Sequence, residues 1–368
     1  MSMTGKPLVL VTGGAGFVGS HLVRQLASEQ TVAVLEKPGA NLSRLADLIE
    51  AGRVELRLAD IRKQPETQKA LEGCQEIYHL AANPRLWTYP KGDFLRVNYH
   101  GARHVIESAL RQGARRVLHC STESILTRAR QAGSIGADQV VPPDEVVGPY
   151  CRSKHKAEVF ALALGKKGHP VVVVNPTLPV GPGDPGSTPP GRLILDFCLG
   201  KRREVIAAEV NLVDVRDVAT AMRLALGRAE PGRRYLLGGE NFTIRELFCI
   251  LAKITGLPGP RFTVPWPVAM LAAWVEETAA DAYTRHEPAA TLTGVLLARR
   301  RMSFEAGPSL SALGAKIRPA VESLRDAVIW LASQGLIQLP ANSAQTADIH
   351  ARSSIYLPKT ATRAISPC

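Results

Sequence analysis

Cysteine is scarce in this sequence, and the few cysteines lie far apart. Six occur in 368 residues, with no CxxC pair and no cluster of histidines beside them. Disulfide frameworks and zinc sites both depend on such spacing, so the pattern disfavours each of them and predicts no metal. We expect most of these thiols to be small buried side chains in a reducing compartment.

Long hydrophobic runs are also missing. The longest candidate, residues 264–275, contains Pro265 and Pro267 and is followed by two glutamates. A membrane-spanning helix needs about 20 apolar residues, and no signal-peptide pattern opens the chain, so we expect a cytoplasmic protein. Because residues 264–275 have no strongly charged face, we interpret them as a buried helix of a capping domain, not as an interfacial helix.

Acidic residues are outnumbered by basic ones. Lysine and arginine total 45 against 33 aspartates and glutamates, giving a net charge of +12. Short basic clusters stand at residues 201–203 and 299–301, but aromatic residues make up only 5% and are not interleaved with them. This pattern disfavours nucleic acid as a partner. It favours an anionic small molecule, with peripheral contact to anionic lipid as a less favoured alternative.

Apolar, β-branched runs alternate with helix-length segments through the first half of the chain. They lie at residues 8–11, 32–35, 54–58, 77–80, 117–119 and 171–174. Near-continuous apolar strands separated by helices predict a parallel sheet buried on both faces, which is the doubly wound α/β (Rossmann) architecture.

The same pattern divides the chain into parts. Residues 7–180 are predicted to form a dinucleotide-binding domain, and residues 181–336 a smaller, mostly helical substrate-binding portion. Residues 211–239 are expected to return in part to the first domain. Residues 337–368 are rich in alanine, serine and threonine and lack periodicity, so we expect a poorly ordered tail.

A glycine-rich turn follows the first predicted strand. Gly13, Gly16 and Gly19 have the GxxGxxG spacing, and a helical run begins directly afterwards with Phe17 and Val18 inside the motif. In this context the glycines allow a tight turn, a close approach of pyrophosphate to bare backbone, and close packing of helix on strand. The turn therefore predicts a nucleotide cofactor, with Phe17 and Val18 beside it.

The choice between NAD and NADP should depend on the end of the second strand. Glu36 can accept hydrogen bonds from a free ribose 2′-hydroxyl and would repel a 2′-phosphate, whereas Lys37 would pair with that phosphate. We favour NAD and keep NADP open. After the third strand, Asp60 and Ile61 are placed to reach the adenine, although Asp60 can also be read as a helix cap.

Tyr150 and Lys154 form a YxxxK motif at the start of a predicted helix. Four residues separate them, so the two side chains share one helix face. An ammonium near the phenol would lower its pKa and fit it for proton transfer, and the ammonium can also hold the nicotinamide ribose. A hydroxyl partner is expected after the strand at 117–119, where Ser121, Thr122 and Ser124 are all candidates.

Together these motifs resemble the extended short-chain dehydrogenase/reductase (NAD-dependent epimerase/dehydratase) family, over about residues 8–335. The resemblance rests on TGGAGFVG at 12–19, the pair Ala81 and Ala82, Asn98 in RVNYHG, and YCRSK at 150–154. It implies a Rossmann fold, a nicotinamide dinucleotide, and Thr122 as the catalytic hydroxyl beside Tyr150 and Lys154. It also implies a structural role for Asn98, and that Asn175 and Pro176 pack on the nicotinamide.

Four later segments are similar to the bacterial hopanoid-associated sugar epimerases. They are VNPTLPVGPGD, STPPGRLILDF, NLVDVRDVA and RRYLLGGENFTI. The sequence departs from that subgroup at Glu123, at Glu36 and over residues 128–141. In the substrate region Trp87, Glu123, Arg192 and Arg300 are candidate contacts, with the arginines suited to grip a diphosphate.

The resemblance supports three hypotheses for the function. The first is an NAD(P)-dependent epimerase of a sugar or sugar nucleotide, acting through a transient ketone, in a homodimer. The second is a net ketone reductase or alcohol dehydrogenase of the dihydroflavonol-reductase or hydroxysteroid-dehydrogenase kind. The third, a catalytically silent dinucleotide sensor, is disfavoured because Tyr150 and Lys154 are both present.

Overall fold

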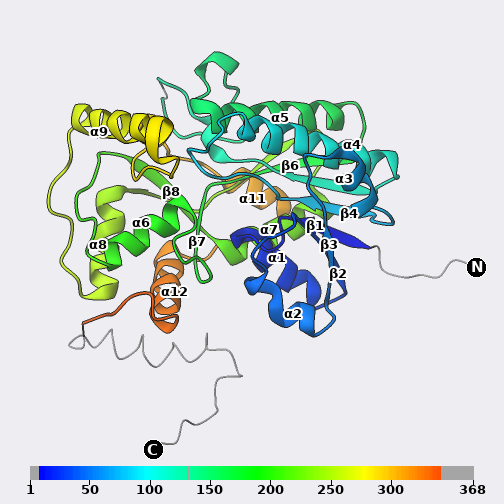
Figure 1. The fold of residues 1–368 in the computed structure, drawn as a ribbon, viewed down its shortest axis with the longest axis horizontal. Coiled ribbons are helices and arrows are strands. Elements are labelled where there is room, and N and C mark those ends of the chain that lie inside the picture. Colours follow the sequence, from blue (N-terminus) through cyan, green and yellow to red (C-terminus); the bar gives the residue numbers. More distant parts are fainter. Residues whose placement is uncertain (1–7, 131, 341–368) are drawn as a thin grey trace, which may run out of the picture.

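A seven-stranded parallel sheet forms the centre of the molecule (Figure 1). The computed structural model describes residues 8–130 and 132–340. In spatial order the strands are β3 (Val54–Leu58), β2 (Val32–Glu36), β1 (Val9–Thr12), β4 (Glu76–His79), β5 (Arg116–Cys120), β6 (Val171–Pro176) and β9 (Arg234–Leu237). Each of the six predicted apolar runs overlaps a strand, and the predicted doubly wound fold is confirmed.

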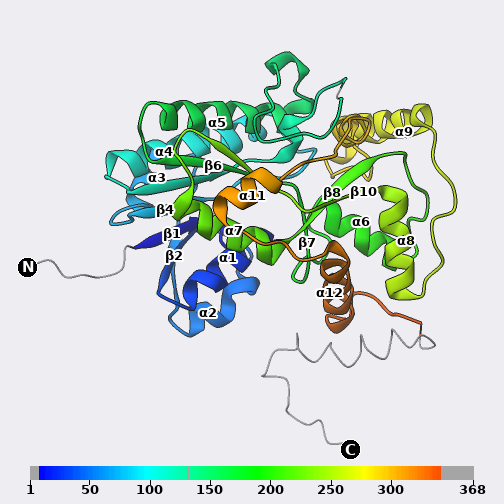
Figure 2. The ribbon, with the colours of Figure 1, turned by 180° about the vertical axis from the view of Figure 1, so that it is seen from behind.

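Helices cover both faces of this sheet, which is why its strands are apolar on both sides (Figures 1 and 2). On one face lie α3 (Gln64–Ala70), α4 (Ala102–Arg111) and α5 (Gly148–Lys166). On the other lie α1 (Phe17–Ala27), α2 (Ala46–Glu50), α7 (Val215–Arg228) and α11 (Gly307–Leu313). Short helical turns η1 (Ser43–Leu45), η2 (Leu95–Gly101), η3 (Glu123–Leu126) and η4 (Pro143–Glu145) connect them.

A second, smaller unit has its own sheet and core. Its strands are β7 (Leu178–Val180), β8 (Glu209–Asp214) and β10 (Glu240–Thr243), with β8 central. Helices α6 (Pro189–Cys198), α8 (Ile244–Thr255) and α12 (Ala320–Ser333) close a separate apolar core over them. Of residues 211–239, α7 and β9 belong to the large sheet, whereas the end of β8 belongs to the small one.

The predicted capping helix is not in the buried position expected, and only residues 337–340 of the predicted tail are described. Ile337 packs into the core of the smaller unit, and the tail from residue 341 onward lies outside the described residues. Residues 264–275 do enter a helix, α9 (Trp266–Ala279), followed by η5 (Ala280–Thr284) and α10 (Leu292–Ala298). The prediction that this helix is buried was wrong, because only Ala273 in α9 is buried.

Within the described residues, no helix combines the length and apolarity that spanning a bilayer would require.

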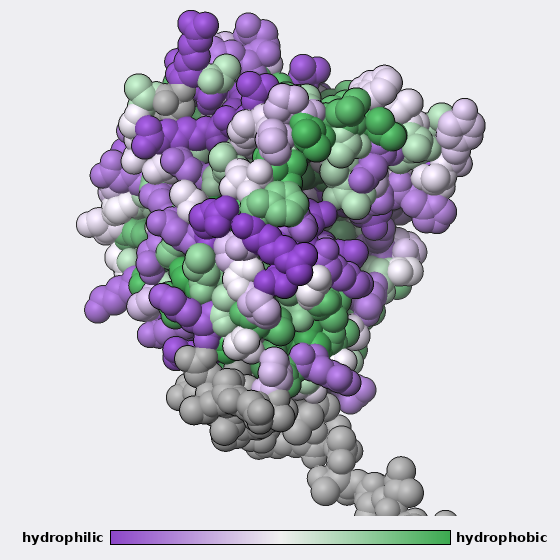
Figure 3. Space-filling model, turned by 90° about the vertical axis from the view of Figure 1, so that its left-hand side faces the viewer, coloured by the Kyte–Doolittle hydropathy of each residue, from purple (hydrophilic) through white to green (hydrophobic). Residues whose placement is uncertain are grey.

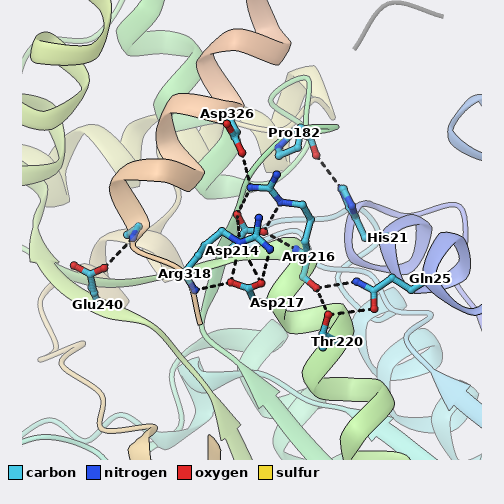
Figure 4. A network of polar contacts seen from close by, with 11 residues as sticks. His21, Gln25, Pro182, Asp214, Arg216, Asp217, Thr220, Glu240, Arg318 and Asp326 are labelled. Atoms are coloured by element: carbon cyan, nitrogen blue, oxygen red, sulfur yellow. Dashed lines mark hydrogen bonds and ion pairs between the residues drawn. The ribbon is translucent and has the colours of Figure 1, made fainter. Parts of the chain in front are cut away.

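A network of charged side chains joins the two units around Asp214, at the end of β8 (Figure 4). Its carboxylate is fully buried, caps α7 through the Arg216 N–H at 2.7 Å, and pairs with the guanidinium of Arg216 at 2.6 Å. Arg318, just before α12, lies 3.5 Å from Asp214 and bonds Asp217 in α7 at 2.7 Å. Burial opposes ionisation of Asp214, but Arg216 outweighs it and holds the pKa of this carboxyl below its ordinary value.

We expect Asp214→Ala to lower the free energy of unfolding by about 2–3 kcal/mol, measured by urea denaturation. The substitution removes a helix cap and leaves two guanidinium groups with one partner fewer. Asp326→Ala is the matched control, because Asp326 also pairs with Arg216, at 2.7 Å, but is partly exposed. Asp326→Ala should lower the free energy of unfolding by less than about 1 kcal/mol. Equal losses in the two variants would contradict the role of the buried carboxylate.

Candidate active site

The glycine turn lies where the strand order reverses, between β1 and β4. Gly13 has a φ of 71°, and a Cβ there would stand 2.8 Å from the backbone of Ala81. A Cβ on Gly19 would stand 2.2 Å from the carbonyl oxygen of Gly13. Only glycine allows these approaches, so α1 begins against the chain that leaves β4, in the crevice where doubly wound sheets bind ligands.

The N-terminus of α1 is open to an anion. Gly16 caps the helix without a side-chain hydrogen bond, and the first turn carries no acidic residue. Gly16 is exposed, and a Cβ there would meet only the Gly13 carbonyl, at 3.1 Å. Phe17 is buried and Val18 half-buried behind it. Free backbone N–H groups and the helix dipole suit a pyrophosphate at this position.

Glu36 is fixed at the end of β2, beside the glycine turn. One carboxylate oxygen accepts the Ala15 N–H at 2.7 Å. Burial raises the pKa of Glu36, against the opposing effects of that hydrogen bond and of Lys37. Lys37 itself is exposed. A carboxylate held in this position can accept ribose hydroxyls and would repel a 2′-phosphate.

Asp60 and Ile61 both make hydrogen bonds or packing contacts with neighbouring residues of the chain. The carboxylate of Asp60 accepts the backbone N–H of Arg62 at 3.0 Å and pairs with its guanidinium at 2.6 Å. Ile61 is buried against Gly101, and its carbonyl accepts a hydrogen bond from His104 at 2.8 Å. Asp60 therefore caps a turn here, and its contact with adenine remains a prediction.

Asn98 connects the segment after β4 to the helix that carries the YxxxK motif. It lies in the π-helical turn η2, where its oxygen accepts the Asn83 N–H at 2.7 Å. Its nitrogen donates to the Asn83 carbonyl at 3.1 Å and to the Ser153 hydroxyl at 3.0 Å. Ala81 and Ala82 precede this clamp, and Ala81 donates its N–H to Thr12 at 3.1 Å. The asparagine thus sets the spacing between the two segments.

Thr122, Glu123 and Tyr150 meet at the carboxyl end of β5. The Thr122 hydroxyl donates to Glu123 at 2.8 Å and lies 2.9 Å from the Ser124 hydroxyl. Tyr150 lies in the first turn of α5, and its pKa responds to the side chains of Thr122 and Glu123, which places the three side chains near one another. Of the three hydroxyls considered from the sequence, the structure places Thr122 beside Tyr150.

The Lys154 side chain is buried, one turn after Tyr150 on α5. Its ammonium donates to the Cys120 carbonyl at 2.7 Å, and burial lowers its pKa. Burial raises the pKa of Tyr150, and nearby Cys151 and the carboxyl of Glu123 add to the shift, while Thr122 opposes it. The pKa of Tyr150 is therefore raised in this structure, contrary to the lowering by Lys154 that the sequence predicted.

Asn175 reaches the same centre from β6. Its nitrogen donates to the Thr122 carbonyl at 2.8 Å and to Glu158 at 2.6 Å. Glu158 is buried and pairs with Arg234 at 2.5 Å, so the carboxylate is neutralised locally. The buried Asn175 oxygen has no partner among the described residues. Together with the adjacent Pro176, this oxygen fits the carboxamide of a nicotinamide.

Three candidate substrate contacts are occupied by other parts of the chain. Arg300 donates to the carbonyls of Thr127 and Glu145, at 2.5 and 2.6 Å. Arg192 pairs with Asp196 at 3.2 Å on an exposed face of α6. Trp87 is buried and donates to Asp281 at 2.8 Å, which fixes the segment after β4 against η5. The fourth candidate, Glu123, lies close enough to Tyr150 for its charge to raise the pKa of the phenol.

Sequence reasoning missed two groups at the site. Phe94 is buried and packs edge-on against the Tyr150 ring, with 6.1 Å between centroids. Arg44 bonds the carbonyls of Ala15 at 3.4 Å and Gly183 at 3.0 Å, so it bridges the glycine turn and the loop after β7. Neither residue stands in a motif, and no signal in the sequence distinguishes them from ordinary core and surface residues.

No group of three or more His, Cys, Asp or Glu side chains in the described part of the chain is arranged to hold a metal ion.

Comparison with known proteins agrees with this geometry. Residues 9–238 match the model of the NAD dependent epimerase/dehydratase family. The "Putative dihydroflavonol 4-reductase" of Synechocystis sp. is 32% identical, over 89% of this chain and 95% of the relative. "Sterol demethylase protein B" of Methylococcus capsulatus is 30% identical, over 89% and 99%. The crystal structure of gox2253 is 31% identical with a TM-score of 0.79, over 90% of this chain and 100% of that one.

The chain belongs to the NAD-dependent epimerase/dehydratase family of extended short-chain dehydrogenases/reductases. The predictions of the family, of an enzyme and of a nicotinamide dinucleotide as the cofactor class are thereby confirmed. The glycine turn, the uncapped start of α1 and the unpartnered Asn175 oxygen fit that cofactor.

Glu123 makes stability depend on pH near neutrality. Burial raises its pKa to about 7. A carboxyl whose pKa is raised on folding favours the folded state at low pH, and this contribution is lost as pH rises through the folded pKa. Glu123→Gln cannot ionise, so it should gain about 2 kcal/mol relative to wild type between about pH 5.5 and 8.5. Denaturant unfolding at both pH values measures the difference.

Glu145→Gln serves as the control for this experiment, because the Glu145 carboxylate pairs with Arg128 at 2.9 Å and has a lowered pKa. It should show no such gain with rising pH. Parallel pH profiles for wild type and Glu123→Gln would contradict the raised pKa.

Proposed function

We propose that this protein interconverts a secondary alcohol and a ketone on a neutral, largely apolar substrate, with NAD as its dinucleotide. The observation that carries the proposal is the convergence of Thr122, Tyr150 and Lys154 at the end of β5, facing the crevice beside the glycine turn. The proposal follows the second hypothesis drawn from the sequence, a ketone reductase or alcohol dehydrogenase, and places it before the first, a sugar epimerase.

Each side chain has a defined task in this reaction. The Tyr150 oxygen takes the proton of the substrate hydroxyl during oxidation and returns it during reduction. The Thr122 hydroxyl holds the substrate oxygen, and Lys154 stabilises the phenolate and the position of the ribose. The bound nicotinamide supplies the hydride acceptor or donor. Glu123 is best kept neutral, because its ionised form raises the pKa of Tyr150.

The proposal for an apolar substrate rests on how the arginines are used. A sugar nucleotide carries a diphosphate, which proteins grip with free guanidinium groups. Arg300 is committed to two backbone carbonyls and Arg192 to Asp196. The two relatives cited above are named for a dihydroflavonol and for sterol demethylation, and both names denote uncharged ring compounds.

The sugar epimerase is the second candidate, and the fixed carboxylate of Glu36 suits it as well as the first. A carboxylate fixed on the Ala15 N–H selects NAD, and an epimerase needs a cofactor that stays bound while the ketone turns and is reduced on its opposite face. The dinucleotide released from denatured protein separates the candidates. Stoichiometric NAD in the purified protein supports epimerisation, whereas reversible binding and net formation of NADH with a cyclic alcohol support the proposal.

We expect Tyr150→Phe to reduce turnover at least about a hundredfold, because the proton acceptor is removed. The affinity for dinucleotide should stay within about tenfold of wild type, since one hydroxyl is lost from a large interface. Tyr283→Phe makes the same chemical change on a side chain in η5 that is 84% exposed, and it should leave turnover unchanged. Steady-state rates and dinucleotide titration test this, and substantial activity in Tyr150→Phe would remove the assigned role.

The cofactor preference should depend on the charge of Glu36. Glu36→Gln keeps an oxygen for the Ala15 N–H but removes the repulsion of a 2′-phosphate, so the preference for NAD over NADP should fall about tenfold or more. Dissociation constants for both dinucleotides measure it. Glu50→Gln, an exposed position on α2, is the charge-matched control. An unchanged ratio in Glu36→Gln would show that another group selects the ribose.

A further inference from the structure

Helix α9 presents an apolar face to solvent, on the side of the molecule shown in Figure 3. Val268, Leu271 and Val275 are spaced three and four residues apart and so share one face, with Trp274 beside them. Leu271 is 61% exposed and Trp274 56%. Phe262, just before the helix, is also exposed. These five residues are called the α9 face.

Three chain segments bring basic residues to the start of this face. The backbone N–H of Arg261 donates to the Arg203 carbonyl at 3.0 Å in a parallel pairing, so the basic cluster at 201–203 runs alongside residues 259–261, with Arg203 nearest Phe262. Arg245 donates to the Thr263 hydroxyl at 3.0 Å. Lysine and arginine at positions 201, 202, 203, 245 and 261 thus lie on or beside the segment that leads into α9, and two acidic residues, Glu204 and Glu246, lie among them.

The acidic residues at the other end of α9 point away from the apolar face. Glu276 accepts the Ala290 N–H and Glu277 the Leu292 N–H, both at 2.8 Å. Lys91 pairs with Glu277 at 2.9 Å and with Asp281 at 2.6 Å. These three carboxylates hold α9 and η5 to the rest of the protein. They leave the exposed side apolar and its surroundings basic.

We propose that the α9 face docks on the surface of a bilayer containing anionic lipid, with the five basic residues on the headgroups. Basic residues near such a surface are attracted to its anionic headgroups, and apolar side chains inserted at the boundary add their burial. Tryptophan is well suited to this position because its ring is apolar and its N–H polar. The proposal concerns a surface and does not depend on the reaction.

A second copy of the chain is a poorer occupant of this face. The chain has a net charge of +12, and two copies joined here would bring a surplus of positive charge to the rim of the contact. An anionic surface instead complements both the apolar centre and the basic edge.

Sedimentation of the full chain with vesicles tests the proposal. We expect binding to vesicles of equal parts phosphatidylglycerol and phosphatidylcholine, little binding to phosphatidylcholine alone, and weakening by salt. Leu271→Glu should reduce binding about tenfold or more, and Arg202→Glu should do so on anionic vesicles. The matched controls are Val140→Glu, at a position 77% exposed in the loop before η4, and Lys167→Glu at the end of α5. Both should bind as wild type.

A second readout reports the position of the helix. Insertion of the α9 face should shift tryptophan fluorescence to the blue, and Trp274→Phe should remove most of that shift while the protein still sediments. Unchanged thermal unfolding of Leu271→Glu and Arg202→Glu shows that they are folded. Wild-type binding by folded Leu271→Glu would overturn the proposal, as would a dimer that dissociates in this variant and never binds vesicles.

Discussion

One fully buried carboxylate, Asp214, stands where the two hydrophobic cores of this protein meet. The strand that ends there belongs to the smaller sheet, and the helix that it caps packs on the larger one. Two arginines, one on each side of the junction, neutralise it. Since a charge buried in this way is tolerated only with its partners in place, the junction fixes the orientation of the smaller unit over the crevice.

In the active site, too, most buried charged groups have a partner that compensates them. Lys154 is buried but bonded to a carbonyl, and Glu158 is buried but paired with Arg234. Glu123 alone is buried near the reacting hydroxyls without a cation, and its proton affinity is raised accordingly. The centre is therefore close to neutral around neutral pH, which suits the transfer of a proton through a phenol more than the binding of a charged group.

The sequence predicted the features that depend on short-range constraints. Gly13, Tyr150 and Lys154 were found because a turn, or one turn of helix, sets their geometry within a few residues. The opposite holds for Arg300, whose carbonyl partners lie 173 and 155 residues earlier in the chain. From the sequence alone, Arg300 could not be distinguished from an arginine whose guanidinium is free to bind a ligand.

Helix α9 illustrates a different limit. Its composition is that of a core helix, and apolar composition ordinarily means burial. Exposure in this case is decided by where η5 and α10 anchor it, through Glu277 and Asp281, and those contacts are made with distant segments. Residue pattern alone therefore could not distinguish a buried helix from an exposed one.

Arg44 and His21 hold the loop after β7 against α1 and the glycine turn, where we expect the pyrophosphate to bind. His21 bonds the Pro182 carbonyl at 2.9 Å, and Arg44 bonds Gly183 and the glycine turn. The loop therefore contacts the same end of α1 at which we expect the dinucleotide to bind. A substrate that holds this loop more firmly in place should therefore raise the affinity for the dinucleotide. By thermodynamic reciprocity, the dinucleotide then raises the affinity for the substrate by the same factor.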